Sequence, residues 1–196
     1  MTLNRIPLAG VLIALVLFIW AASKYPGGYD WANDFISTFF AATTPSGDVN
    51  EARYYAVAAM FVLCVSVAIL FHVLSTCANR LVHHKVLQIG GIGSMVYAFL
   101  VVTPMHDLLV SISLVFFLAA MAAAIHLLYV ERRWVLFWAG LMCLGILLSA
   151  AAMYYGNVLW NLLPLAQKAS FVVCLIWLLA MQFALENRAE NAMPLG

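Results

Sequence analysis

Charged side chains are scarce in this 196-residue sequence, where they make up only 9% of the residues. Soluble globular domains carry about 25% charged residues, so the composition excludes a water-soluble globular protein. Nine Lys and Arg against eight Asp and Glu give a formal net charge of +1. That balance leaves no basic surplus for a nucleic-acid partner, so no nucleic acid is expected.

Cysteine pairs and catalytic motifs are also missing. The four cysteines are scattered over apolar stretches without a CxxC pair, so neither a disulfide framework nor a zinc finger is predicted. The sequence has no GxSxG, HExxH, Walker or dinucleotide-binding motif. The motifs therefore name no reaction and no cofactor, and whether the protein is an enzyme stays open.

Apolar residues dominate instead, at 66% of the chain with a mean hydropathy of +1.03. A helix needs roughly 20 apolar residues to cross the hydrocarbon core of a bilayer. Six stretches qualify, and the first is longer than the apolar core of a signal peptide. We expect an all-α, polytopic membrane bundle of six transmembrane helices forming a single domain over 1–196, with spans at about 6–23, 53–77, 86–103, 108–130, 134–155 and 166–185.

Basic residues in the short connections predict the orientation. Six fall on the side of the two termini, at Arg5, Arg80, Lys85, Arg132, Arg133 and Arg188. Three fall on the other side, at Lys24, Arg53 and Lys168. The excess predicts a plasma (cytoplasmic) membrane protein with both termini in the cytoplasm. An interfacial aromatic belt on the outer side includes Tyr29, Trp31, Tyr154, Tyr155 and Trp160.

The first outer connection, about 24–52, is long for so small a protein. Turn signals flank it at 26–28 and 44–47. Between them, Trp31, Phe35 and Phe39 recur every four residues, which predicts a short amphipathic helix over 31–42. We expect this helix to lie on the membrane surface or to cap the bundle, and a plain connector is the alternative.

Polar residues at the outer ends of the spans predict an outward-facing pocket. A carboxylate next to an imidazole, as at His106 and Asp107, can hold a metal ion or act as a base. The alternative is that Asp107 caps its helix and that His106 is wetted at the interface. The ligand-binding candidates are Asp34, Ser37, Asn50, Arg53, His106, Asp107 and Lys168.

A second polar group lies near the cytoplasmic ends of the spans. His72 and His126 are at similar depth on different helices, which is what bis-imidazole haem ligation requires. Hydrogen bonding between helices, with Gln88 and Gln182, is the alternative. His83 and His84 fall in a short basic turn that we expect to face lipid headgroups.

Three segments, 34–56, 101–107 and 166–185, resemble a large bacterial group of six-helix membrane proteins of unknown function and, more distantly, the DRAM/Frag/Sfk membrane proteins. An Ile-Ser pair, a following Pro and an Asn at a helix start match Ile36, Ser37, Pro45 and Asn50. Thr38 stands where an acidic residue commonly follows the serine. The resemblance implies a multi-pass membrane protein and supplies no catalytic residues.

Two functions follow as hypotheses. In the first, the protein binds membrane lipids, another small amphiphile or a membrane partner, including a second copy of itself, through the outer pocket. In the second, it is a small intramembrane enzyme or redox protein, either a metal-assisted hydrolase at His106 and Asp107 or a haem protein through His72 and His126. A channel or carrier is a third possibility, but six short helices with few buried charges argue against a gated ion path unless the protein oligomerises.

Overall fold

The computed structural model describes residues 5–78 and 80–192, with side chains through Leu185. Helices form its framework, and the described residues contain no strand beyond an isolated antiparallel bridge between Thr43 and Val49. The elements, in chain order, are α1 (Ile6–Ser23), η2 (Ile36–Phe40), α2 (Ala52–Thr76), α3 (Leu81–Leu100), α4 (His106–Val130), α5 (Trp134–Gly156), η3 (Trp160–Leu162) and α6 (Leu163–Ala192).

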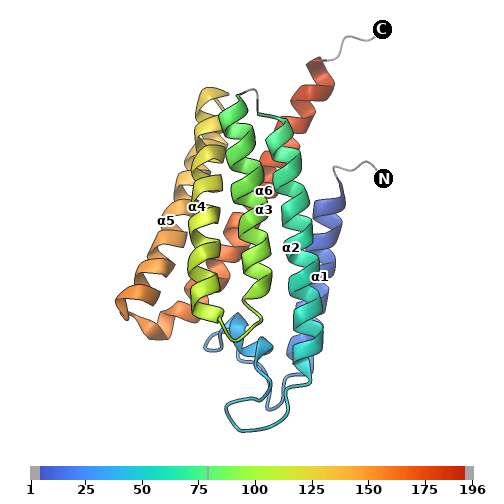
Figure 1. The fold of residues 1–196 in the computed structure, drawn as a ribbon, viewed down its shortest axis with the longest axis vertical. Helices are drawn as coiled ribbons and strands as arrows, with labels where there is room; N and C mark the ends of the chain where they lie inside the picture. Colours follow the sequence, from blue (N-terminus) through green and yellow to red (C-terminus); the bar gives the residue numbers. More distant parts are fainter. Residues whose placement is uncertain (1–4, 79, 193–196) are drawn as a thin grey trace.

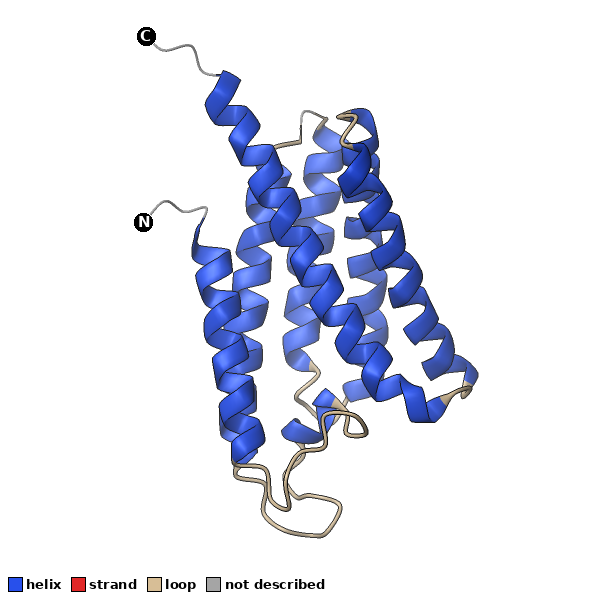
Figure 2. Ribbon diagram, turned by 180° about the vertical axis from the view of Figure 1, so that it is seen from behind, coloured by secondary structure: helices blue, strands red, loops and turns tan. Residues whose placement is uncertain are grey.

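The long helices run side by side as a bundle (Figure 1). The start of α1 and the end of α6 lie at one end, here called the terminal end. The connections 24–51, 101–105 and 157–162 lie at the other, here called the loop end. Helix α3 packs between α2 and α4, and α1 packs on α2. Helix α6 crosses the opposite face of the bundle obliquely and lies in front in Figure 2.

Five helical segments are long and apolar enough to cross a membrane, namely α1, α2, α4, α5 and the segment 160–185. The chain is therefore a multi-pass membrane protein. The remaining predicted span, 86–103, is not confirmed by its length and hydropathy. Helix α3 begins at Leu81, so its first turns include His83, His84 and Lys85 and lower its hydropathy. The stretch interpreted as a basic connection is thus the start of a helix.

The predicted amphipathic helix over 31–42 is not confirmed either. The connection forms only a 3-10 helix of five residues, η2, after Phe35 in an extended conformation. The Asn50 side-chain amide donates to the carbonyls of Thr38, Phe39 and Ala41, at 3.3, 3.1 and 2.9 Å. Carbonyls that accept from a side chain offer the backbone an alternative to a continuous helix, and this explains the short element.

The main apolar core fills the half of the bundle near the terminal end. Its buried side chains come from 67–74 of α2, Leu87 of α3, 120–128 of α4, Cys143 of α5 and 174–185 of α6. A β-carbon at Gly91 would lie 2.1 Å from Cγ of Phe71, so only glycine lets α3 approach α2 this closely. A separate apolar cluster at the loop end joins α1, the first connection and the start of α2.

Candidate functional site

The first connection is fastened to α6 at the loop end. Lys168 Nζ donates to the backbone carbonyl of Asp34, and also to the carbonyl of Pro164 at 3.3 Å. The Gln167 side-chain oxygen accepts from the backbone N–H of Ile36 at 3.2 Å. Two predicted site residues, Asp34 and Lys168, are thus brought together, and their contact holds the connection on the helix.

Tyr29 strengthens the same attachment from within the connection. Its hydroxyl donates to the Asp34 carbonyl at 3.1 Å, and the Lys168 ammonium lies 5.6 Å from the centre of its ring. Burial raises the pKa of Tyr29 well above its usual range, and the charge of Asp34 adds to the effect. The phenol therefore keeps the proton that it donates. The ring stacks on Phe39 with centroids 4.1 Å apart.

The other candidates from the first connection have different surroundings. Asn50 is 2% exposed, and its side-chain amide donates hydrogen bonds to three carbonyls of the connection. Its Oδ1 is buried and has no hydrogen-bond partner within the described part of the chain. Arg53 is exposed on α2 and Ser37 half-buried on η2. No side-chain hydrogen bond joins either residue to the other candidates in the ranges that the structure describes.

A second polar group, here called the α4–α5 junction, consists of His106, Asp107, Ser111, Tyr154 and Tyr155. The Asp107 Oδ1 atom accepts from the Tyr154 hydroxyl at 2.8 Å and lies 3.0 Å from His106 Nδ1. The Ser111 hydroxyl lies 2.7 Å from the Tyr155 hydroxyl. Figure 1 shows α5 leaning away from α4 toward the loop end. The two tyrosines therefore bridge helices that diverge.

The α4–α5 junction stays open to its surroundings. The Asp107 side chain is 81% exposed and the His106 side chain 33% exposed. Both contacts to the Asp107 carboxylate use Oδ1, and within the described residues no hydrogen bond reaches Oδ2. One carboxylate oxygen can thus accept a hydrogen bond from a ligand.

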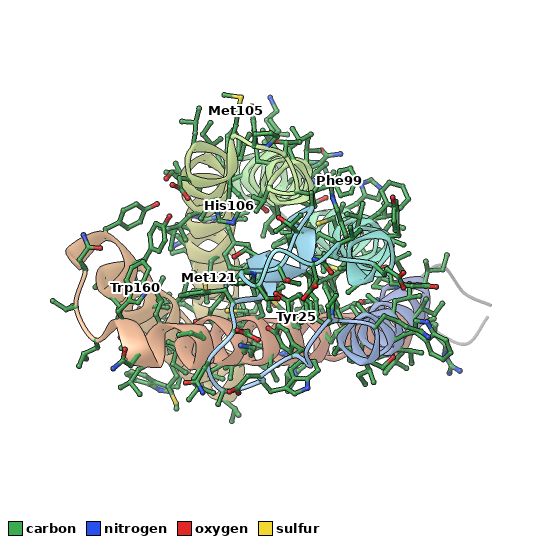
Figure 3. The ribbon with its side chains drawn as sticks, turned by 90° about the horizontal axis from the view of Figure 1, so that it is seen from below. Tyr25, Phe99, Met105, His106, Met121 and Trp160 are labelled. Atoms are coloured by element: carbon green, nitrogen blue, oxygen red, sulfur yellow. The ribbon has the colours of Figure 1, made fainter. Side chains whose placement is uncertain are left out.

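An aromatic contact joins the two polar groups. The Trp160 ring, at the turn between α5 and α6, stacks on Tyr154 with centroids 6.1 Å apart and meets Phe35 at 5.9 Å. Figure 3 shows His106 on the side of α4 that faces the interior of the bundle, whereas Trp160 lies at the edge. The predicted single pocket is therefore two polar groups with an aromatic connection between them.

The two tyrosines of the α4–α5 junction and the neighbouring Trp160 were not predicted as site residues. Tyr154, Tyr155 and Trp160 read from the sequence as members of a general interfacial belt. Their specific role depends on the tilt of α5, which hydropathy does not encode. The spacing of His106 and Ser111 carries no motif that points to a tyrosine more than forty residues away.

The two histidines predicted as haem ligands are not brought together. His126 faces His83, with 2.6 Å between His83 Nε2 and His126 Nδ1. His72 is exposed on α2, and no hydrogen bond or ring contact joins it to His126 in the part of the chain that the structure describes. Gln182 is buried in the core, at 1% exposed. Sequence reasoning missed the contact of His83 with His126 because it placed His83 in a connection.

The described residues contain no group of three or more His, Cys, Asp or Glu side chains that could share a metal ion. His106 and Asp107 contact each other, and no third residue of these types joins them within the described ranges. Comparison with known proteins found no matching family model, no matching curated protein and no matching solved structure. The resemblance carried by 34–56, 101–107 and 166–185 therefore stays a prediction.

Proposed function

We propose that this six-span protein of the plasma membrane binds a lipid or another small amphiphile at the α4–α5 junction. The observation that carries the proposal is the exposed carboxylate of Asp107, with one oxygen free to accept a hydrogen bond, at the loop end of two diverging apolar helices. Because the carboxylate is an acceptor only, it favours a headgroup with hydrogen-bond donors, such as hydroxyl or ammonium groups. The hydroxyls of Tyr154 and Tyr155 offer further contacts nearby.

The faces of α4 and α5 that continue from the junction toward the terminal end suit an acyl chain. Val115 lies four residues after Ser111 and Leu148 seven residues before Tyr155, so each shares the face of its polar neighbour. Both are exposed, at 66% and 46%, rather than packed against the opposite helix. An apolar chain that lies along these faces would bury them, at a gain of about 25 cal/mol per Å² of apolar area.

The proposal counts the segment 86–103, which lies largely in α3, as a span in addition to the five long apolar helices. Helix α3 runs beside the other helices from the terminal end to the loop end, which supports its inclusion (Figure 1). An even number of spans agrees with the start of α1 and the end of α6 lying at one end. The excess of basic residues near that end supports cytoplasmic termini, although the Arg188 side chain lies outside the described ones.

Native mass spectrometry of the protein, extracted in mild detergent, tests the proposal. We expect the wild-type chain to retain an amphiphile and the Asp107→Ala and Tyr154→Phe variants to lose most of it. Glu51→Gln is the matched control, because Glu51 is an exposed acidic residue at the loop end outside the junction. Equal retention by all four proteins, or no bound amphiphile in any of them, would refute the proposal. The same spectra report a homo-oligomer or another membrane subunit, the alternative occupants.

A further inference from the structure

The contact between His83 of α3 and His126 of α4 lies at the terminal end, away from the α4–α5 junction. The two ring nitrogens are 2.6 Å apart, and His126 is exposed while His83 is half-buried. The ring centroids are 4.8 Å apart. In each imidazole ring, a fixed distance separates the nitrogen from the ring centre. The centroid separation is close to the sum of these two distances and the nitrogen–nitrogen distance. The two nitrogens therefore lie almost on the line between the ring centres. The rings therefore meet edge to edge, with their nitrogens facing.

We propose that His83 and His126 form a binding site for a divalent transition-metal ion, with Zn²⁺ as its main occupant. Imidazole nitrogen is a preferred ligand for Zn²⁺, Cu²⁺ and Ni²⁺. Two imidazoles on adjacent helices supply half of a tetrahedral Zn²⁺ shell, and water fills the remaining positions. This inference is independent of the α4–α5 junction, because the two sites share no residue.

The observed geometry needs a small adjustment to hold the ion. Zn–N bonds of about 2.0–2.1 Å in a tetrahedral shell place two nitrogens about 3.3 Å apart. Rotation of the two rings about their side-chain bonds opens the 2.6 Å separation and turns both lone pairs toward one point. The exposure of His126 leaves room for its ring to rotate, and His83 is only half-buried.

The proton between the rings must move when the ion binds. A neutral imidazole carries one N–H and one lone pair, and a metal ion binds the lone pair. The nitrogen that donates in the contact therefore shifts its proton to the other nitrogen of the same ring, and the net charge of the pair does not change.

The neighbouring groups leave the pair available. His84 uses Nδ1 in a contact of 2.8 Å with the carbonyl of Ser75. The Tyr129 ring packs beside His126 with centroids 6.4 Å apart. The positive charge of Arg80 opposes a cation, but Arg80 is exposed, so water and salt screen its charge.

Isothermal titration with ZnCl₂ tests the site, on full-length protein in detergent that carries no polyhistidine tag. We expect one equivalent of Zn²⁺ to bind the wild-type chain at pH 7.5 and to bind much more weakly at pH 5.5, because protons compete with Zn²⁺ for imidazole nitrogens. The His83→Ala and His126→Ala variants should lose this binding. His72→Ala and His106→Ala are matched controls and should keep it. No binding by the wild type, or the same binding by all five proteins, would overturn the site, as would loss in His106→Ala alone.

Two additions keep the result clear if an alanine variant folds poorly. His126→Asn keeps a polar side chain that can still contact His83 but is a poor Zn²⁺ ligand, so it should also lose binding while its Tm without metal stays near that of the wild type. Cu²⁺ electron paramagnetic resonance counts the ligating nitrogens. Two imidazole nitrogens in the wild type and fewer in His83→Ala support the site, whereas the same pattern in both proteins contradicts it.

Discussion

The two ends of the bundle are held together by different means. Toward the terminal end, α2, α3, α4 and α6 pack through apolar side chains, and Gly91 allows α3 to approach Phe71 closely. At the loop end, an apolar cluster holds the first connection on α1 and α2, but the contacts between α4 and α5 are hydrogen bonds and ring contacts between partly exposed groups, such as Asp107 with Tyr154. Packing of the first kind stabilises a fold, whereas exposed polar groups can exchange their partners for a ligand. The contrast assigns stability mainly to the terminal end and the binding of an amphiphile to the loop end.

The sharpest test of this contrast is a pair of glycine substitutions. In Gly91→Ala the new β-carbon would lie 2.1 Å from Cγ of Phe71, so the helices must separate. We expect a loss of about 1–3 kcal/mol, as for other overpacked cores. Gly145→Ala on α5 meets no atom within 4 Å and should be neutral, or stabilising by up to about 1 kcal/mol. Thermal unfolding in detergent measures both, and an equal loss of Tm would contradict the contrast.

Asn50→Ala probes the part of the loop end that is buried. The carbonyls of Phe39 and Ala41 lose this donor, whereas the Thr38 carbonyl still accepts from the Ala41 backbone N–H at 3.4 Å. A buried acceptor left without a partner costs about 1–3 kcal/mol. We expect a lower Tm together with faster proteolysis within 36–49. Asn33→Ala is the control, because Asn33 is exposed and bonds only within its own turn. Proteolysis of Asn50→Ala at the wild-type rate would show that Asn50 does not order the connection.

Tyr154→Phe should affect stability less than either change above. The variant loses one hydrogen bond to an exposed carboxylate, at about 0.5–1.5 kcal/mol or less, and keeps the ring that stacks on Trp160. Its Tm should fall by a few degrees at most while amphiphile retention falls strongly. A large loss of Tm with unchanged retention would reverse the roles assigned to the two ends.

The smallest expected effect is the pH dependence of the contact between His83 and His126. The pKa of His83 is lowered in the folded chain relative to about 6.5 in an unfolded one. As the pH falls below that value, the unfolded chain takes up the proton first, so stability decreases. In EDTA, the wild type should lose slightly more Tm between pH 7.5 and pH 5.5 than His83→Ala does. A wild type that gains Tm relative to the variant would contradict the lowered pKa.

The spans follow from the sequence because hydropathy reports which segments avoid water. The predicted 6–23 and 134–155 correspond to α1 (Ile6–Ser23) and α5 (Trp134–Gly156). Hydropathy does not show where a helix ends when its last turns consist of polar residues. Helix α3 begins at Leu81 rather than near 86, and for that reason the position of His83 beside His126 escaped prediction.

The sequence predicts several residues of the candidate site, but it does not predict which of them contact each other. Asp34 and Lys168 were placed in one group, and they do meet, through the backbone carbonyl of Asp34 rather than its carboxylate. Asp107 was recognised as a polar residue at a helix start, whereas its partner Tyr154 was not. The pairing depends on how far α5 tilts from α4, and no local pattern in the sequence specifies that tilt.

The most direct test of the central claim is photolabelling in membranes with a lipid that carries a photoactivatable acyl chain, followed by peptide mapping. Binding at the α4–α5 junction predicts that label concentrates on peptides from 106–118 and 144–160 and decreases there in Asp107→Ala. Label spread evenly over the exposed apolar helix faces, with no change in the variant, would contradict a lipid site at the loop end.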